Sequence, residues 1–298
     1  MEPAGLRPLG IGEIIDVAIK IYRARFWVLV KSVAVVVGPV FALSAIIRIS
    51  IPSGDNLLVE SEPGATPDFD FDQFLPFIAG TLLIALVAFV ASQVATGACF
   101  KAISGAYLEE DPDWRESLRF AQSKLGSLLW LSFLMAILLL PAILACVLPG
   151  VYLYVAWAVA APVLLLEDRR GWSAMKRSRE LVKGRFWPTL AVLLLVLILT
   201  AVVQAVFLGI FAGLVSVTGN EVARALADAI GQTLSSALTT PLSAAILAVL
   251  YFDLRVRKDG FDLELLARRM GVDVAPLAGP GDPPPSWRAE PEWPPKDG

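Results

Sequence analysis

The sequence predicts an all-α polytopic membrane protein with six transmembrane helices arranged as three hairpins, each preceded by an interfacial amphipathic helix. Three observations predict this fold class. Hydrophobic residues make up 56% of the 298 residues and charged residues only 18%, against about half and about a quarter in soluble domains. The apolar residues come in long blocks. Lys and Arg gather in alternate segments between those blocks, as in chains that cross a bilayer repeatedly.

Six blocks reach or approach the length of about 20 residues that a spanning helix needs. The predicted spans are Trp27–Ile47, Phe74–Phe100, Leu125–Leu148, Val151–Leu166, Trp187–Val217 and Ala229–Phe252. The fourth is the shortest and contains Pro162, whereas the fifth is long enough to tilt or break. Pro149-Gly150 predicts an uncharged tight turn that joins the third and fourth spans into a helical hairpin.

The positive charges set the orientation of these spans. Of the 25 Lys and Arg residues, 22 fall in the N-terminal segment, the loops after the second and fourth spans, and the tail. The loop from Ile51 to Asp72 has neither Lys nor Arg but six acidic residues. Cytoplasmic loops carry the positive charge, so we expect both termini in the cytoplasm.

A short amphipathic segment precedes each predicted hairpin. The apolar faces run from Ile11 to Tyr22, from Trp114 to Leu125 and from Ala174 to Val182. The first and third segments end in the same triplet, Arg25-Phe26-Trp27 and Arg185-Phe186-Trp187, at an offset of 160 residues. The second segment lacks the triplet. We interpret the chain as three repeated units. The segments either bind the lipid surface or a partner, or only turn the chain along the interface, and we favour the second interpretation.

Four regions follow from this pattern. Residues 1–26 form a cytoplasmic N-terminus with an amphipathic helix, and residues 27–252 form the six-helix transmembrane domain. Residues 253–270 form a cytoplasmic amphipathic segment, with a short helix expected over Phe261–Met270 after Gly260. Residues 271–298 are rich in proline and cannot bury a core, so we expect a disordered tail.

Composition argues against several kinds of chemistry. The chain has no histidine, which excludes histidine acid–base catalysis and histidine metal ligation. Its two cysteines, Cys99 and Cys146, are far apart and fit small apolar side chains. The acidic stretch Asp68-Phe-Asp-Phe-Asp lacks the ordered ligand spacing of a calcium loop, so we expect no metal and no cofactor. The basic residues lie beside apolar spans, which predicts no nucleic-acid binding.

The predicted spans contain few polar groups at depth. Lys31 lies about one turn from the inner surface, whereas Gln204 and Gln232 are neutral. An ion-coupled pump is therefore disfavoured. The serines and threonines from Ser235 to Thr240 fit close helix packing better than a broken-helix substrate site.

One candidate binding site remains, in the loop after the fourth span. Arg177 and Ser178, helped by Arg179, have the donors to contact a lipid phosphate in the headgroup layer. The alternative is that the two arginines only supply cytoplasmic positive charge and that Ser178 is a small residue on the buried face. We favour the alternative.

Two stretches carry a family resemblance. The first runs from Pro149-Gly-Val-Tyr-Leu-Tyr-Val-Ala-Trp through Glu167 and Ala174-Met-Lys-Arg-Ser to Trp187. The second is Tyr251-Phe-Asp-Leu-Arg-Val-Arg-Lys-Asp-Gly-Phe-Asp-Leu. Over about residues 8–268 the chain resembles the bacterial "glycerophosphoryl diester phosphodiesterase membrane domain" family, related to YciC-like multi-pass inner-membrane proteins, in an actinobacterial form. In the phosphodiesterases of that family a separate soluble barrel hydrolyses the substrate with histidines and carboxylates. The resemblance therefore implies a membrane architecture and no catalytic residue.

These observations predict a non-catalytic integral protein of the bacterial inner membrane. We expect a structural or accessory role, in assembly with other membrane proteins or with itself, or in shaping the lipid surroundings. The alternative is a transporter or permease subunit for a small or lipid-like substrate. An enzyme is the least favoured class.

Overall fold

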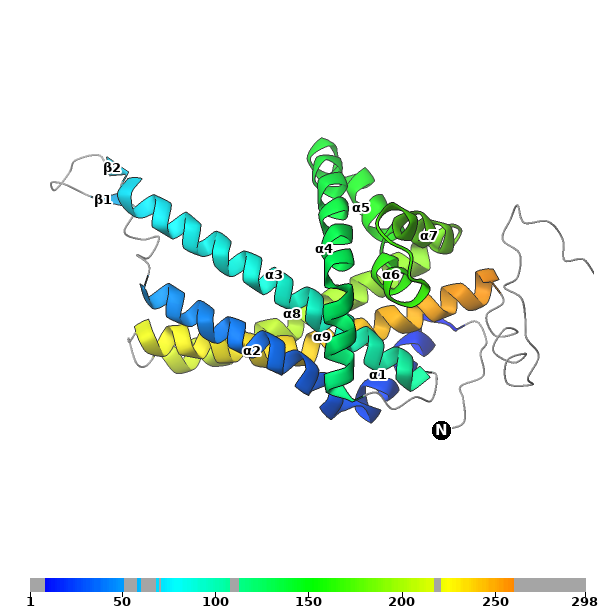
Figure 1. Cartoon of the computed structure of the whole chain (residues 1–298), viewed down its shortest axis with the longest axis horizontal. Coiled ribbons are helices and arrows are strands. Elements are labelled where there is room, and N and C mark those ends of the chain that lie inside the picture. The colour runs from blue at the N-terminus through cyan, green and yellow to red at the C-terminus, as the bar shows by residue number, and fades with distance from the viewer. Residues whose placement is uncertain are drawn as a thin grey trace, which may run out of the picture. The chain divides into compact units, whose positions relative to one another are not determined.

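The computed structural model describes residues 9–50, 58–59, 68–69, 71–107, 113–216 and 221–259, and these residues are almost entirely helical (Figure 1). The helices are α1 (Ile11–Ala24), α2 (Phe26–Ser50), α3 (Phe71–Tyr107), α4 (Trp114–Ala145), α5 (Val147–Ala156), α6 (Ala160–Glu167), α7 (Trp172–Val182), α8 (Phe186–Ser216) and α9 (Glu221–Asp259). Two short strands, β1 (Leu58–Val59) and β2 (Asp68–Phe69), pair antiparallel with Leu58 opposite Phe69.

Six helical segments are long and apolar enough to cross a membrane: α2, α3, α4, α5 together with α6, α8 and α9. The predicted class, an all-α polytopic membrane protein with six candidate spans, is confirmed. The helix that contains the fifth predicted span, α8, is unbroken, and the sixth span continues through Pro241 within α9. The fourth span is interrupted, because α5 ends at Ala156 and α6 begins at Ala160.

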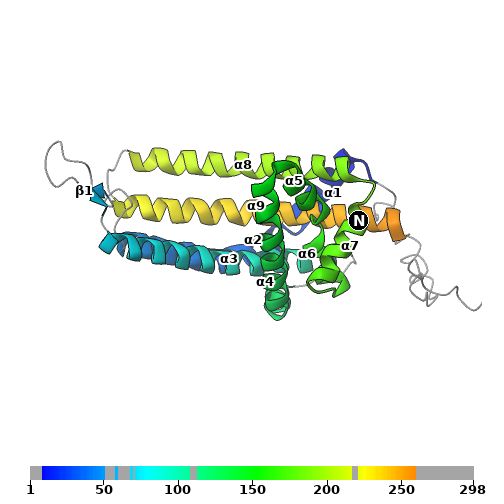
Figure 2. The same cartoon turned by 90° about the horizontal axis from the view of Figure 1, so that it is seen from above.

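One compact unit runs from Leu9 to Phe252 and contains the candidate spans up to that residue. Within it, α2, α3 and α8 follow about the same direction, together with α9 as far as Phe252, while α4 lies across them (Figures 1 and 2). Small residues allow the crossing of α3 and α4. A Cβ atom on Gly97 would lie only 3.1 Å from the Ala121 Cβ and 3.3 Å from Leu128 Cδ1. The two backbones therefore meet where Gly97 faces Ala121, and the Leu128 side chain fills the space beside them.

A second contact made by small residues joins α2 to α9. Ala45, Ala225 and Ala229 form a buried cluster, with Phe41 packed against it. Gly38 of α2 lies opposite Thr233 of α9, where an added Cβ would be 3.6 Å from the threonine methyl group. Alanine and glycine at these positions let α2 and α9 approach closely, the usual basis of helix association in membranes.

The hairpin turn between the third and fourth spans is not where the sequence placed it. Pro149 and Gly150 lie inside α5, and the chain breaks at Cys146, whose backbone is extended (φ −170°, ψ 141°). Pro149 falls in the first turn of α5, where its missing N–H has no helical partner to lose. Gly150 instead serves packing, since a Cβ there would lie 2.4 Å from Ile143 Cγ1 of α4.

The second amphipathic segment is not a separate helix. Trp114 begins α4, which continues without interruption to Ala145, and Asp113 caps it by accepting the Trp114 N–H at 2.8 Å. The apolar face of the segment, with Leu118 and Ala121, packs on Val94 and Ala98 of α3. The repeat of helix, elbow and span therefore holds for the first and third units only.

The other two amphipathic helices bury their apolar faces against protein. In α7, Ala174, Met175 and Leu181 are at most 1% exposed, and the helix packs on α5 and α6. In α1, Ile14 and Ala18 are buried, and α1 contacts α2, α3 and α8. These faces therefore anchor the helices to the protein and not to lipid.

The second unit comprises Met1–Pro8 and Asp253–Gly298, and the structure describes it only over Asp253–Asp259, the end of α9. Two ion pairs stabilise this end: Arg257 with Asp253 at 2.9 Å, and Arg255 with Asp259 at 3.5 Å. The helix expected over residues 261–270 and the disordered tail expected over residues 271–298 lie outside the described residues.

Candidate functional site

The three predicted headgroup contacts lie in consecutive positions on α7 but point to different surroundings. Ser178 is fully buried, Arg177 is half-buried, and Arg179 is exposed. The structure therefore does not bring them together as one phosphate site. Ser178 cannot contact a headgroup, and this part of the expectation is corrected. The favoured alternative, a small residue on the buried face of the helix, describes Ser178 as it lies. Contact of Arg179 with lipid stays a prediction.

Ser178 instead closes the break in the fourth span. Its Oγ donates a hydrogen bond of 2.9 Å to the carbonyl oxygen of Ala156, the last residue of α5. The break over Trp157–Val159 frees that carbonyl from its helical partner, and the surrounding Val155 and Val159 are fully buried. A buried carbonyl without a partner is costly, so the serine hydroxyl satisfies a group that the broken helix leaves open.

Arg177 belongs to a second arrangement, which we call the Glu167 cluster: Glu167, Arg169, Arg177 and Tyr251. The Glu167 Oε2 atom accepts from Arg177 Nε at 3.1 Å and lies 3.3 Å from Arg169 Nε. Its Oε1 atom accepts from the Tyr251 hydroxyl at 3.0 Å. The Glu167 side chain is 11% exposed, and Tyr251 is fully buried. Both carboxylate oxygens are thus occupied by donors.

This geometry defines what the Glu167 cluster can do. A general base needs a lone pair directed at a substrate, and a nucleophile needs a base within reach. Glu167 receives donors on both oxygens, because three side chains from α7, α9 and the connection after α6 converge on it. A buried, hydrogen-bonded charge pair of this kind fixes relative positions. The cluster therefore joins the end of α6 to α7 and α9.

The connection between α6 and α7 is tight. Asp168 has a left-handed backbone (φ 53°), as does Gly171 (φ 53°), where a Cβ would lie 3.1 Å from Nε1 of Trp130. The Asp168 carboxylate accepts from Lys124 Nζ of α4 at 2.5 Å, and this hydrogen bond lowers the pKa of Asp168. Because Asp168 is exposed, the pair positions the loop more than it stabilises the fold.

The two elbows that carry the repeated triplet begin their second helix in the same way but end the first differently. Arg25 donates its N–H to Ile21, four residues earlier, and its carbonyl accepts the first bond of α2 from Leu29, both at 3.0 Å. Arg185 donates its N–H to Val182, three residues earlier, at 2.8 Å, and its carbonyl accepts from Thr189 at 3.0 Å. The internal repeat read from the sequence is therefore a structural repeat at the start of α2 and of α8.

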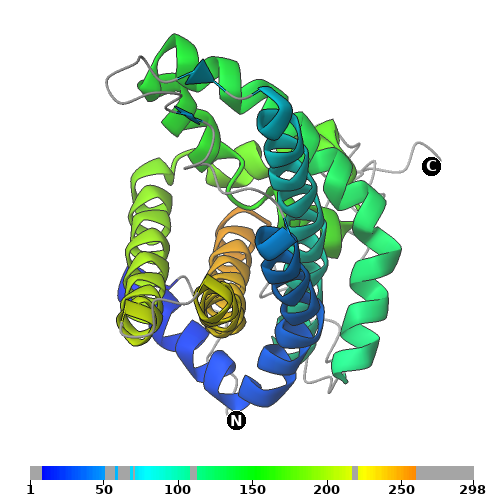
Figure 3. The same cartoon turned by 90° about the vertical axis from the view of Figure 1, so that its left-hand side faces the viewer.

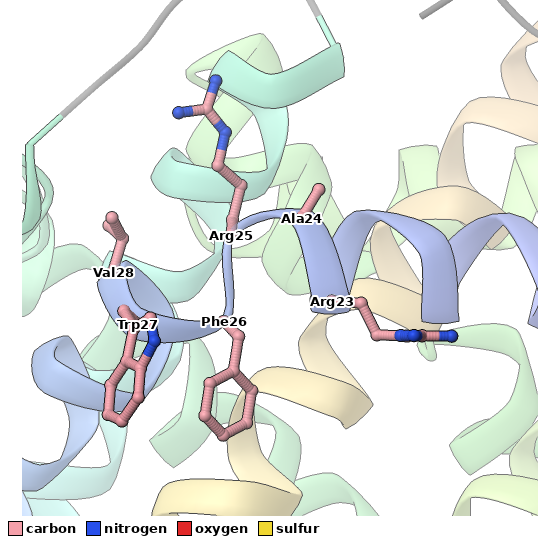
Figure 4. A pocket seen from close by; sticks show the side chains of 6 residues that line it. All are labelled: Arg23, Ala24, Arg25, Phe26, Trp27 and Val28. Carbon is pink, nitrogen blue, oxygen red and sulfur yellow. The ribbon is translucent and has the colours of Figure 1, made fainter.

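The aromatic pairs of the elbows match as well. The Phe26 and Trp27 rings are 5.4 Å apart at 77°, and the Phe186 and Trp187 rings are 5.6 Å apart at 85°. In Figure 4 the Phe26 and Trp27 side chains point to one side of the chain and Arg25 to the other. An open hollow of about 570 Å³ lies here, lined by residues 23–28. Exposed tryptophan beside arginine is the composition that suits a membrane–water interface.

Metal binding finds no support in the described part of the chain, where no three acidic or cysteine side chains gather in a group that could hold an ion. Most of the acidic stretch between Glu60 and Asp70 lies outside the described residues. The sequence interpretation named Glu167 and Tyr251 only as parts of a resemblance. A carboxylate at the end of an apolar run was the available signal for Glu167.

The fold and these contacts define an all-α polytopic membrane protein whose charged groups at the α6–α7 connection serve helix packing. The chain belongs to the family described as a domain of unknown function (DUF8558), whose model matches residues 120–269. The matched stretch begins in α4 and contains the Glu167 cluster, the elbow at Arg185 and the described length of α9. No curated protein and no solved structure matches the chain.

Proposed function

We propose that the protein is a non-catalytic component of a bacterial inner membrane, with both termini in the cytoplasm. Six candidate spans and the alternation of Lys and Arg support this topology. The resemblance to the YciC-like family points the same way, since it carries over an architecture without catalytic residues. Purified protein should therefore not hydrolyse glycerophosphodiesters. Turnover that a point mutation in this chain abolishes would overturn that part of the proposal.

Its role in this proposal is to assemble with another membrane protein through the α4–α5 surface. We define this surface by the large apolar side chains that α4 and the first turn of α5 leave exposed between Leu128 and Pro149: Trp130, Phe133, Ile137, Leu140, Ile143, Leu144, Val147 and Leu148. The observation that carries the proposal is that α4 lies across α3. Its second half thereby leaves the direction shared by α2, α3 and α8 (Figures 1 and 3).

The base of this surface is held firmly. Trp130 of α4 lies against Gly171, Lys124 pairs with Asp168, and α5 is tied to α7 through Ser178. A surface fixed by its own protein loses little conformational freedom when a partner packs on it, which favours association. Packing of complementary helices, and not a hydrophobic driving force, would provide the affinity within a bilayer.

Site-specific photocrosslinking in native membranes tests the assembly role. A benzophenone side chain replaces Leu144 of α4, which is 78% exposed, and in a matched variant Leu197 of α8, which is 62% exposed. We expect a discrete protein adduct from position 144 and only lipid adducts from position 197. Lipid adducts alone from both positions would show that the α4–α5 surface has no protein partner.

A second candidate function, a permease subunit for a small or lipid-like substrate, is favoured by one specific observation. A cavity with a polar wall lies between α8 and α9, in two of the candidate spans. Co-purification of a small molecule would support this candidate, whereas a crosslinked protein partner would support the first.

A further inference from the structure

The cavity between α8 and α9 has a volume of about 310 Å³. One part of its wall is polar, formed by Gln204 of α8 and by Asp228, Gln232 and Ser235 of α9. The other part is aromatic, formed by Phe207 and Phe211 of α8. The volume lies at the lower end of the range for small-molecule pockets, and a mainly apolar wall with a few convergent polar groups is the usual composition of such sites.

Asp228 is the charged group of this wall. The predicted sixth span began at Ala229 and so left this carboxylate outside, but α9 begins at Glu221 and places Asp228 about two turns inside the helix. Asp228 is therefore a helical residue of the candidate span Val222–Asp259, beyond the start of the predicted span. An acidic side chain within a spanning segment is expensive and faces a partner, a cavity or a ligand pathway.

Ser235 gives an independent indication that a polar group of the cavity wall needs a hydrogen-bond partner. The residue is 3% exposed, and its Oγ has no hydrogen-bond partner among the residues that the structure describes. A hydroxyl buried in this way loses its water without gaining a bond, which costs stability unless a bound molecule provides the partner. Because Ser235 lines the cavity, a ligand there would be within its reach.

The position of the Phe211 ring in the aromatic wall also depends on α9. A Cβ on Gly231 would lie 2.9 Å from Cδ2 of Phe211, so the phenylalanine ring occupies the space that a larger residue would fill. Phe211 is thereby held beside the polar wall. Figure 3, with α8 in yellow-green and α9 in olive to orange, shows the two helices as neighbours.

The charges of the wall select the sign of the ligand. Asp228 is negative, and no Lys or Arg is among the residues that line the cavity. Arg224 precedes Asp228 by one turn, but its side chain is exposed and is not part of the wall. Phenylalanine faces attract cations through the ring quadrupole, and a carboxylate pairs with them directly. Carboxylate, amides and aromatic rings together recognise an organic ammonium group.

We propose that the α8–α9 cavity binds an ammonium group carried on a small apolar body. Asp228 pairs with the charge, and Gln204, Gln232 and the Ser235 hydroxyl offer hydrogen bonds around it. Phe207 and Phe211 contact the apolar body. Two sources offer this chemistry: a free organic cation, or the ethanolamine headgroup of a phospholipid. The site does not involve the α4–α5 surface, so its failure and that of the assembly proposal are distinguishable.

The test measures binding of benzylammonium, whose charged group carries N–H donors, to the full chain in an uncharged maltoside detergent by equilibrium dialysis. Wild-type protein should bind this cation at least tenfold more tightly than ethylbenzene, its neutral isostere. The nearly isosteric Asp228→Asn should weaken cation binding about tenfold and leave the neutral compound unchanged. Glu180→Gln, which removes an exposed carboxylate of α7, is the matched control and should bind as wild type does.

Two further variants keep the test valid if Asp228→Asn does not fold. Ser235→Ala removes a hydroxyl with no described partner, so it should fold normally and weaken the cation several-fold. Ala205→Phe fills the cavity from an exposed position of α8 and should abolish binding.

Displacement of the cation by phosphatidylethanolamine, but not by phosphatidylglycerol, identifies the lipid headgroup as the source. Absence of displacement by either identifies a free cation. Equal affinity of cation and neutral isostere, or cation binding unchanged by all three variants, overturns the proposal.

Discussion

The Tyr251 hydroxyl of α9 donates a hydrogen bond of 3.0 Å to Glu167, a residue 84 positions earlier at the end of α6. The ring of Tyr251 is completely buried, and the same carboxylate also accepts from Arg177 of α7. One acidic side chain therefore links three helices: α6, which forms the second half of the fourth span, α7 and α9. The first prediction concerns this bond.

Tyr251→Phe removes the hydroxyl and keeps the buried ring. Because the acceptor is charged, we expect a loss of about 2 kcal/mol in the free energy of unfolding. Glu167→Ala should cost more, since it also deprives the half-buried Arg177 of its carboxylate. Reversible unfolding in mixed micelles measures both. Tyr154→Phe, on a 53%-exposed ring of α5, is the control and should be neutral. A Tyr251→Phe protein as stable as wild type would show that the bond is not stabilising.

Ser178 and Arg179 should separate into a structural and a surface role. Ser178→Ala leaves the Ala156 carbonyl without its donor, which should cost about 1 kcal/mol. Arg179→Gln should change the free energy of unfolding by less than about 0.5 kcal/mol, as for other exposed positions. The same substitution should weaken binding of anionic lipid to the purified protein, because each basic side chain near an anionic membrane surface contributes about 1 kcal/mol to the attraction. If Ser178→Ala weakened binding of anionic lipid and Arg179→Gln did not, the assignment of a structural role to Ser178 and a surface role to Arg179 would be contradicted.

The crossing of α3 and α4 should be sensitive to a single methyl group. Gly97→Ala places a Cβ 3.1 Å from the Ala121 Cβ, so the helices must move apart, at a cost of about 1–3 kcal/mol. Gly126→Ala, in α4, meets no atom within 4 Å and should instead stabilise by about 0.5–1 kcal/mol through helix propensity. Unfolding of both variants in detergent is the measurement. Equal stability of the two variants would mean that the crossing tolerates separation.

Cys146 is a natural reporter of the α4–α5 turn. It is exposed at the break between the two helices, whereas Cys99 is buried in α3. In intact cells with Cys99 replaced by alanine, a membrane-impermeant maleimide should label Cys146 from outside if α4 crosses the bilayer. A second variant lacks both native cysteines and carries Arg170→Cys in the connection between α6 and α7, which we expect in the cytoplasm. This variant should remain unlabelled until the cells are opened. Labelling of the Arg170→Cys variant in intact cells would contradict the six-span topology.

Much of the architecture could be predicted from the sequence, because membrane spans are visible in it as uninterrupted apolar runs. Of the three repeated units predicted, the first and third could be recognised from one triplet, and the ring geometry at Phe26–Trp27 and Phe186–Trp187 matches between them. The second unit was wrong, because its amphipathic segment is continuous with α4. The turn at Pro149-Gly150 could not be placed correctly, because proline is equally acceptable at the start of a helix and glycine is equally acceptable at a close contact. Neither residue type by itself distinguishes a tight turn between two helices from the packed first turn of one helix.

The sites were harder to predict for a physical reason. Pro162 in the first turn of α6 follows the break after Ala156, but it does not show which carbonyl is left open or that the Ser178 hydroxyl reaches it. The Tyr251–Glu167 bond joins residues that only the fold brings together. Asp228 precedes the predicted sixth span, and the sequence does not show that α9 extends past it or that α8 lines a cavity with it. The surroundings of each of these polar groups are decided by tertiary structure.

The bond from Ser178 to Ala156 also bears on how the chain is made. When α5 leaves the ribosome, the donor is still inside the exit tunnel, because it follows 22 residues later. At about 5–20 residues per second, roughly 1–4 s pass before the serine emerges. During that interval the end of α5 carries an unmet carbonyl, which hydrocarbon does not tolerate. The α5–α6 segment should therefore wait at the translocon and enter the bilayer together with the docking of α7.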